Sequence, residues 1–268
     1  MSNQEAASGH GDCPICHGLL VEFYKVPIEI KEMGEDGKET TKIEQHEVAR
    51  PCPRCTTQLQ AGVGTGIPSQ FREADFGKFD FGAYGVDLSK LRQIIESYCN
   101  HFEKARREGK GLYLWSATAG SGKTFLSCCV LRTLILKHGF QGKFVTAVDY
   151  LTAVGKSYDK FRERGEHDPS QIYRVCPVLV LDDLGTQKPG EWQEQEMFRL
   201  IDTRLSNGLV TLITSNFPPE KLNLNFRIID RVIKSSIILQ MPEVSIRRAK
   251  AEKEQADFLS KLLSEGGS

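Results

Sequence analysis

The chain has 268 residues, 40% of them hydrophobic, which is enough for one large domain or for two unequal domains. Its 35 basic and 35 acidic residues balance, so no overall electrostatic field draws it to nucleic acid or to a membrane. Residues 1–57 carry 6 basic and 10 acidic side chains, which leaves the remainder modestly basic. That remainder is compatible with nucleic-acid contact but does not argue for it.

The sequence contains neither a membrane span nor a secretion signal. No stretch approaches the ~20 apolar residues that cross a bilayer, and the polar N-terminus lacks the apolar core of a signal peptide. We therefore expect a cytoplasmic protein with no membrane partner. In that compartment the eight cysteines are expected to be metal ligands or buried thiols rather than disulfides.

Two C-x-x-C pairs near the N-terminus supply four cysteines: Cys13, Cys16, Cys52 and Cys55. Four thiolates in this arrangement are typical of a structural tetrahedral zinc site with no open coordination position. Two strand-like runs, residues 19–30 and 41–48, lie between the pairs, as in a zinc ribbon. His17 and His46 could substitute as ligands, but the paired cysteines make this unnecessary. Because so small a domain, residues 1–57, builds little core, we predict that zinc supplies its folding energy.

Residues 58–86 have the composition of a linker that leads into the next domain, residues 87–268. Four phenylalanines in it could form a partner site, but packing against that domain is the preferred interpretation: Phe71, Phe76, Phe79 and Phe81. Residues 87–108 predict one amphipathic helix, capped by Asp87 and ended by Gly109. The remaining four cysteines lie in apolar contexts and are expected to be buried free thiols: Cys99, Cys128, Cys129 and Cys176.

A glycine-rich loop joins a predicted strand, residues 112–115, to a predicted helix, residues 125–137. Eight residues are assigned to this loop as a phosphate cradle: Ala117, Thr118, Ala119, Gly120, Ser121, Gly122, Lys123 and Thr124. Small residues allow consecutive backbone N–H groups to turn inward around phosphate oxygens at a helix N-terminus. Lys123 would reach the β- and γ-phosphates of ATP or ADP, and the Thr124 hydroxyl would hold Mg²⁺.

The loop departs from the usual G-x-x-x-x-G-K-[ST] pattern at its first position, where Ala117 replaces glycine. Alanine resists the φ > 0 conformations that glycine adopts freely, so this residue puts the geometry of the cradle in question. Taken alone, this stretch could also be an ordinary glycine-rich turn between a strand and a helix, with a lysine on the surface.

Strands and helices alternate through the rest of the chain. The predicted strands are residues 143–148, 177–183, 209–216 and 236–240, and the predicted helices are residues 149–158, 191–205, 226–234 and 245–263. Strands this apolar, alternating with helices, predict an α/β fold in which helices cover both faces of a parallel sheet.

Polar residues at the ends of two of these strands complete a nucleotide site. Asp182 would reach the C-terminal edge of the sheet and orient Mg²⁺ through its water shell, and Asp183 would polarise the attacking water. Asn216, at the tip of a neighbouring strand, would position that water. Each of these could be a plain strand end. About 60 residues after Gly-Lys-Thr, however, an apolar strand ending in Asp-Asp is typical of an ATPase.

These motifs resemble the AAA+ ATPases of the DnaC/DnaI helicase-loader and IstB transposition-ATPase group. The matching stretches are Gly-Leu-Tyr-Leu-Trp (111–115), Gly-Ser-Gly-Lys-Thr (120–124), Leu-Val-Leu-Asp-Asp-Leu-Gly (179–185), Phe-Arg-Leu-Ile-Asp-Thr-Arg (198–204), Thr-Leu-Ile-Thr-Ser-Asn (211–216) and Arg-Ile-Ile-Asp-Arg (227–231). The cysteine-bearing N-terminal module is similar to the zinc-binding domain of DnaI-type loaders. Residues 66–71 are similar to the start of the family's ATPase domain, so the resemblance covers essentially the whole chain.

The resemblance implies further site residues near the C-terminus. Arg231 matches the arginine finger, which completes a neighbouring subunit's site and therefore implies self-association through the ATPase domain; Arg227 is the alternative. Arg247 matches a terminal arginine that senses the nucleotide, and Arg248 could serve instead.

The family also binds single-stranded DNA, through residues near the pore of its assemblies. The aromatic counterparts here would be Tyr158, Phe161 and Trp192, which could stack on bases in any sequence. Each of these side chains could equally be a packing residue.

The resemblance favours a helicase loader, in which the N-terminal domain grips the replicative DNA helicase and the ATPase domain binds single-stranded DNA. Asp183 stands where many AAA+ enzymes have glutamate, and a base that is ~1 Å out of place can lose ~10²-fold in rate. We therefore expect slow hydrolysis that serves as a switch. The alternatives are an IstB-like ATPase that assists a transposase and a nucleotide-binding adaptor with negligible hydrolysis.

Overall fold

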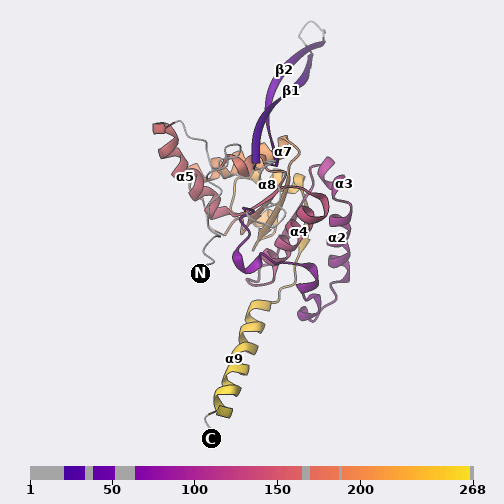
Figure 1. Ribbon diagram of the computed structural model, residues 1–268, viewed down its shortest axis with the longest axis vertical. Coiled ribbons are helices and arrows are strands. Elements are labelled where there is room, and N and C mark those ends of the chain that lie inside the picture. Colours follow the sequence, from indigo (N-terminus) through magenta and orange to yellow (C-terminus); the bar gives the residue numbers. More distant parts are fainter. Residues whose placement is uncertain (1–20, 34–38, 52–63, 165–169, 187–188, 266–268) are drawn as a thin grey trace, which may run out of the picture.

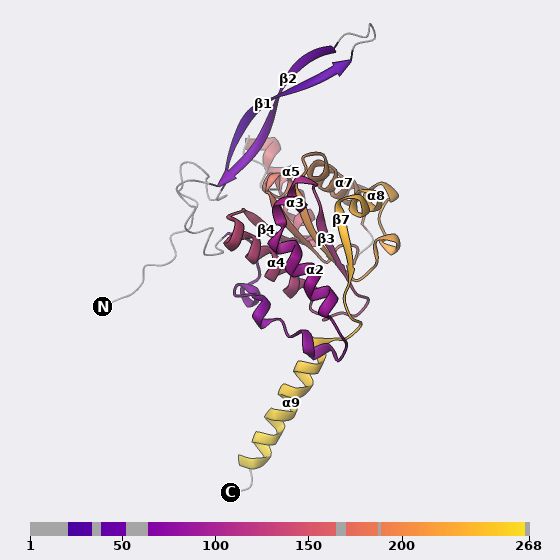
Figure 2. The same ribbon diagram turned by 90° about the vertical axis from the view of Figure 1, so that its right-hand side faces the viewer.

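The computed structural model describes residues 21–33, 39–51, 64–164, 170–186 and 189–265, which form one small and one large β-sheet. The small sheet is an antiparallel hairpin of β1 (Val21–Met33) and β2 (Glu39–Pro51), which extends away from the body of the molecule (Figures 1 and 2). Both strands are longer than their apolar patterns predicted. The cysteines assigned to zinc all lie outside the described residues, so the zinc ribbon stays a prediction.

The large sheet has five parallel strands in the order β4-β5-β6-β3-β7. The strands are β3 (Gly111–Trp115), β4 (Gly142–Thr146), β5 (Val178–Asp182), β6 (Val210–Ser215) and β7 (Ser236–Gln240). Among the inner strands, every residue of β5 and β6 is buried. This burial on both faces explains why their sequences are continuously apolar, and the predicted parallel sheet is confirmed.

Helices cover both faces of this sheet, as predicted. They are α2 (Ser89–Asn100), α3 (Phe102–Arg107), α4 (Lys123–His138), α5 (Ala147–Arg164), α6 (Gln171–Val175), α7 (Glu191–Ser206), α8 (Phe226–Ser235) and α9 (Ile246–Glu265). Side chains of α2, α3 and α4 pack on one face of the sheet, and those of α5, α7 and α8 pack on the other. Figure 2 shows α9 leaving the body as a separate arm. Within the described residues no helix is both long and apolar enough to cross a membrane.

Alternation along β3 shows how one strand serves both cores. Leu112 and Leu114 point into the core beneath α4, and Tyr113 points into the opposite core beneath α7. All three side chains are at most 1% exposed. Because this strand is packed from both sides, the loop that follows it begins from a rigid point.

The phenylalanine-rich segment packs against the core formed by α4 and the large sheet, as predicted. It forms three short 3-10 helices, Ser69–Phe71, Phe76–Lys78 and Phe81–Tyr84. The ring of Phe79 stacks on that of Phe125 in α4, with centroids 6.0 Å apart. The four cysteines expected to be free are buried thiols, which confirms that prediction: Cys99, Cys128, Cys129 and Cys176.

Some predicted helix boundaries were wrong. The helix expected over residues 87–108 breaks at His101 into α2 and α3, because the break turns Phe102 fully into the core, where its ring packs edge-on against Phe140. The strand expected to reach residue 148 ends at Thr146, whose hydroxyl accepts the N–H of Asp149 and so caps α5 in place of Asp149. The short helix α6 was not predicted.

Gly111 is a position in β3 where a side chain has no room. A Cβ there would lie 1.8 Å from the carbonyl oxygen of Thr211 in β6, whereas a Cβ on Gly139, after α4, would have no atom within 4 Å. We predict that Gly111→Ala lowers the free energy of unfolding by at least about 3 kcal/mol, because it forces two paired strands apart. Gly139→Ala, the control, should cost about 1 kcal/mol through its positive φ. Urea unfolding of both variants measures the difference, and equal losses would contradict it.

Candidate nucleotide-binding site

The predicted nucleotide residues converge at the carboxyl edge of the large sheet, where β3, β5 and β6 end. A cavity of about 890 Å³ lies there, between the glycine-rich loop, the phenylalanine-rich segment and the start of α9. Ten of the predicted site residues line it: Ala119, Gly120, Ser121, Gly122, Lys123, Thr124, Asp182, Asp183, Asn216 and Arg247. Residues far apart in the sequence are thus brought to one cavity of the size that nucleotide-sized ligands occupy.

The loop forms a tight cradle ahead of α4. Gly120 and Gly122 have φ of +78° and +88°, which a residue with a side chain rarely adopts. A Cβ on Gly122 would also lie 2.6 Å from the Tyr84 hydroxyl oxygen, and that hydroxyl donates a hydrogen bond to the Ser121 carbonyl at 2.8 Å. Tyr84, which sequence reasoning missed, therefore buttresses the cradle from the phenylalanine-rich segment.

Ala117 fits the loop without backbone strain. Asp183 is the one residue other than glycine with positive φ in the described part of the chain, so Ala117 does not adopt the conformation that alanine resists. The doubt that its sequence raised about the cradle is therefore removed on conformational grounds.

The Lys123 ammonium group folds back over the loop. It donates to the Ser116 and Thr118 carbonyls, each at 3.1 Å, and to the Ser121 hydroxyl at 3.2 Å. Burial lowers the pKa of Lys123, and the nearby carboxylate of Asp183 opposes that shift. The amine is thus held inside the cavity, where it can meet phosphate oxygens.

Asp182 is held between two threonine hydroxyls. Thr124 Oγ1, in the first turn of α4, donates to Asp182 Oδ2 at 3.2 Å, and Thr214 Oγ1, in β6, donates to Oδ1 at 2.6 Å. Asp182 is 7% exposed, and this burial raises its pKa against the two hydrogen bonds. A carboxylate beside a threonine hydroxyl is the oxygen donor set that Mg²⁺ takes in nucleotide sites. Thr214 was missed because it lies within β6, whereas the signal in the sequence was the polar residue at the tip of that strand, Asn216.

Asp183 has a left-handed backbone, with φ of +60°. Its N–H donates to Thr214 Oγ1 at 2.9 Å, and its Oδ1 accepts from Asn216 Nδ2 at 3.3 Å. Asp and Asn adopt this conformation far more readily than longer side chains do. The backbone thus gives a physical reason for aspartate where the resembling family often has glutamate.

Arg231 does not line this chain's cavity. It projects from α8, where its Nε donates to Asp202 Oδ1 at 2.5 Å and its guanidinium lies 4.4 Å from the ring centroid of Phe198. Its neighbour Arg227 lies beside the ring of Phe226, also outside the cavity. Neither arginine can act on a nucleotide held in its own chain without moving.

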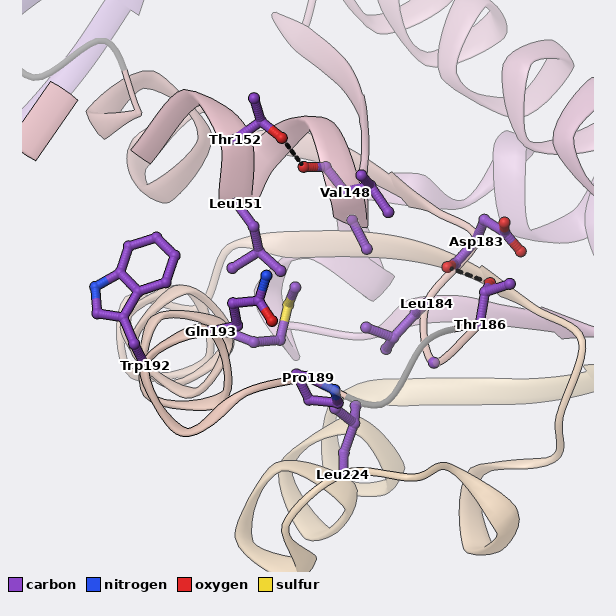
Figure 3. A pocket seen from close by; sticks show the side chains of 13 residues that line it. Val148, Leu151, Thr152, Asp183, Leu184, Thr186, Pro189, Trp192, Gln193 and Leu224 are labelled. Carbon is purple, nitrogen blue, oxygen red and sulfur yellow. Dashed lines mark hydrogen bonds between the residues drawn. The ribbon is translucent and has the colours of Figure 1, made fainter. Parts of the chain in front are cut away.

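Of the three aromatic residues predicted to contact DNA, only Trp192 has a described side chain, so the structure does not show whether they form one surface. Trp192, 40% exposed, lines a second, smaller cavity of about 300 Å³ with Val148, Leu151 and Leu224 (Figure 3). This cavity also reaches Asp183. Tyr158 and Phe161 lie on α5, but their side chains are outside the described part of the structure.

Comparison with known proteins places these features in context. The family model described as IstB-like ATP binding protein matches residues 71–255. The replicative helicase loader DnaI of Bacillus subtilis is 28% identical over 157 residues, which cover 57% of this chain and 49% of DnaI. The replicative helicase loader DnaC of Escherichia coli strain K12 is 25% identical over 149 residues, 54% of this chain and 56% of DnaC. The chain spans about half the length of these curated relatives.

The crystal structure of the DnaC helicase loader superimposes on this chain with a TM-score of 0.56. The alignment covers 65% of this chain and 99% of that one, at 23% identity. At this level of identity the likeness shows a shared fold.

Asp182→Asn should affect the stability of the fold and the binding of ATP in opposite directions. Because the folded-state pKa of Asp182 is raised, ionising it costs the folded chain stability; this cost is absent below the unfolded pKa and complete above the folded one. We predict that the asparagine raises Tm at pH 8 by about 2 °C or more, that this gain vanishes near pH 3, and that Mg²⁺-dependent ATP binding is lost.

Thermal scans at both pH values and titration with a fluorescent ATP analogue measure these effects. Asp257→Asn, at an exposed carboxylate on α9, is the control and should change neither quantity. A lower Tm for Asp182→Asn at pH 8 would contradict the argument.

Proposed function

The chain belongs to the family of IstB-like ATP binding proteins, and from that premise we propose that it is an ATP-dependent loader of the replicative DNA helicase. The observation that carries the proposal is the convergence of the glycine-rich loop, Asp182, Asp183, Asn216 and Arg247 on one cavity. The curated relatives DnaI and DnaC are both replicative helicase loaders, and this supports helicase loading as the purpose of ATP binding.

In this proposal each residue of the cavity has a defined task. Backbone N–H groups of residues 119–124 and the Lys123 ammonium bind the phosphates of ATP. Thr124 and Asp182 would hold Mg²⁺, which when bound neutralises charge on the β- and γ-phosphates. Asp183 accepts a hydrogen bond from the attacking water and polarises it, and Asn216 keeps the carboxylate oriented.

Hydrolysis is proposed to need a second copy of the chain. Arg231 would leave Asp202 and stabilise charge on the γ-phosphate bound by a neighbouring subunit, and Arg247 would sense the nucleotide bound in its own chain. A short aspartate as the base and a finger supplied from outside favour slow hydrolysis. Such an enzyme suits a switch, in which ATP favours the loading complex and hydrolysis releases it.

The N-terminal module would grip the helicase, and zinc would hold that module together. The register of the hairpin pairs Val21 with Pro51, the described residues nearest in sequence to Cys16 and Cys52, which supports a shared site at that end. Single-stranded DNA would contact the ATPase domain through Trp192, whose exposed ring is suited to base stacking.

An IstB-like ATPase that assists a transposase is the second candidate, favoured by the description of the matching family. The two functions differ in partner, because one acts with a replicative helicase and the other with a transposase on duplex DNA.

Lys123→Ala tests the role of ATP in assembly. We predict that it weakens ATP binding at least about tenfold, because the charge-assisted bonds to phosphate are lost, and that it abolishes the ATP-dependent complex with the cognate replicative helicase. Co-elution of full-length chain and helicase, in ATP, in ADP and without nucleotide, measures this. Lys90→Ala, at an exposed lysine on α2, should behave like wild type. Wild-type chain that never binds the helicase but stimulates a transposase on duplex DNA would establish the second candidate instead.

Metal analysis tests the zinc proposal independently of ATP. We predict one zinc per chain, lost in Cys52→Ser together with the hairpin's protection from proteolysis, because four thiolates share one ion. Cys99→Ala, at a buried thiol distant in sequence, is the control and should retain the metal. A folded wild-type hairpin without metal would contradict the proposal.

A further inference from the structure

The link between β7 and α9, together with the first two residues of α9, lies across the glycine-rich loop and spans residues 241–247. The Met241 N–H donates to the Trp115 carbonyl at 2.7 Å, at the end of β3, and the Arg247 N–H donates to the Gly120 carbonyl at 3.3 Å. Backbone bonds thus tie both ends of the segment to the strand and loop that form the phosphate cradle. We call residues 241–247 the strap.

The strap carries a carboxylate, Glu243, that binds the first turn of the loop. Its Oε1 accepts the Ala117 N–H at 3.0 Å, and its Oε2 accepts the Thr118 N–H at 2.7 Å. The hydroxyls of Thr118 and Ser116 also donate to Oε2, at 2.8 Å and 3.1 Å. One side chain therefore satisfies four donors from three consecutive residues. Although burial acts to raise the pKa of Glu243, hydrogen bonds from Thr118, Ala117 and Ser116 lower it overall.

Glu243 holds the loop from outside the nucleotide cavity. Ala117 and Thr118, whose N–H groups it occupies, do not line that cavity, whereas residues 119–124 do. The carboxylate therefore does not take the place of a phosphate. It restrains the turn that precedes the residues lining the cavity.

The same strap positions Arg247 at the cavity. A Cβ added to Gly120 would lie 2.9 Å from the Arg247 Cβ and 2.8 Å from the Ser245 hydroxyl, so the loop and the strap are in close contact there. Arg247 lies in the first turn of α9, the helix that leaves the body as an arm in Figure 2. Any shift of the strap would move Arg247, the loop and the base of this arm together.

We propose that Glu243 is a positioning residue that fastens the glycine-rich loop to the strap, and so couples the nucleotide cavity to Arg247 and α9. Glu243 itself touches no nucleotide. The coupling rests on the proposed ATP-binding function, whereas the fastening rests on the hydrogen bonds alone. The two parts are therefore tested separately.

Hydrogen exchange of the full-length chain without nucleotide tests the fastening. Glu243→Gln keeps the shape of the side chain but replaces one acceptor oxygen with an amide donor, so it cannot accept from both backbone N–H groups. At least one of the Ala117 and Thr118 amides should exchange roughly fivefold faster, the factor expected for one net hydrogen bond of ordinary strength. Glu252→Gln, at an exposed carboxylate on α9, should leave them unchanged. Unchanged exchange in Glu243→Gln would overturn the fastening.

The ratio of ADP to ATP dissociation constants tests the coupling. We expect Arg247→Ala to lower this ratio, which measures the preference for ATP, and Glu243→Gln to lower it as well. In the double variant the ratio should be no more than about twofold lower than in Arg247→Ala alone. A merely structural residue would weaken the binding of ATP and of ADP alike. The coupling is therefore overturned by an unchanged ratio in Glu243→Gln. It is also overturned if the losses of ATP preference in the two single variants simply add in the double variant. A wild-type chain that binds neither nucleotide would instead refute the proposed ATP function and the coupling with it, and the exchange experiment would still decide the fastening.

Discussion

The buried carboxylate of Asp182 is the point at which the elements of the site are joined. Thr124 binds it from α4 and Thr214 binds it from β6, so one side chain at the end of β5 links a helix and a neighbouring strand. Thr214 also accepts the N–H of Asp183 and so sets the direction of the next residue. Because hydrogen bonds to a buried, charged acceptor are strong, a change in any of these partners would reorient the whole edge of the sheet.

Asp183 shows how backbone and chemistry are matched at this edge. Its φ of +60° lies in a region that is costly for most side chains, and such strain persists only where the surroundings enforce it. Here the enforcing contacts are its own N–H bond to Thr214 and the bond from Thr186 to its carbonyl oxygen. The strained residue also borders both cavities, so the smaller apolar cavity lies beside the residue assigned to activate water.

Much of the fold could be predicted from the sequence because the relevant signals are local. The glycine-rich loop and the apolar run ending in Asp182 are continuous stretches, and the alternation of apolar strands with helices indicated one parallel sheet. Glu243 could not be predicted, because its partners lie about 125 residues earlier and it follows no motif. Thr214 lies inside an apolar strand and not at its polar tip, and the break at His101 depended on the packing of Phe102 against Phe140. The sequence thus indicated most of the residues that line the cavity and missed Tyr84, Thr214 and Glu243, which hold them in place.

The surroundings of Arg231 bear on how an assembled form would differ from the lone chain. Its ion pair with Asp202 is partly exposed to water, with 29% and 38% of the two side chains accessible, and pairs of this kind contribute little to stability. Its contact with the Phe198 ring adds a further weak attraction. Exchanging these partners for a γ-phosphate on a neighbouring subunit would therefore cost little free energy. An arginine held this loosely can serve a neighbour without a change of fold, whereas Arg204, fully buried and bonded to the Tyr173, Cys176 and Val210 carbonyls, could not. On the proposed function, slow hydrolysis by the lone chain follows from a finger kept on its own surface rather than from a defective cradle.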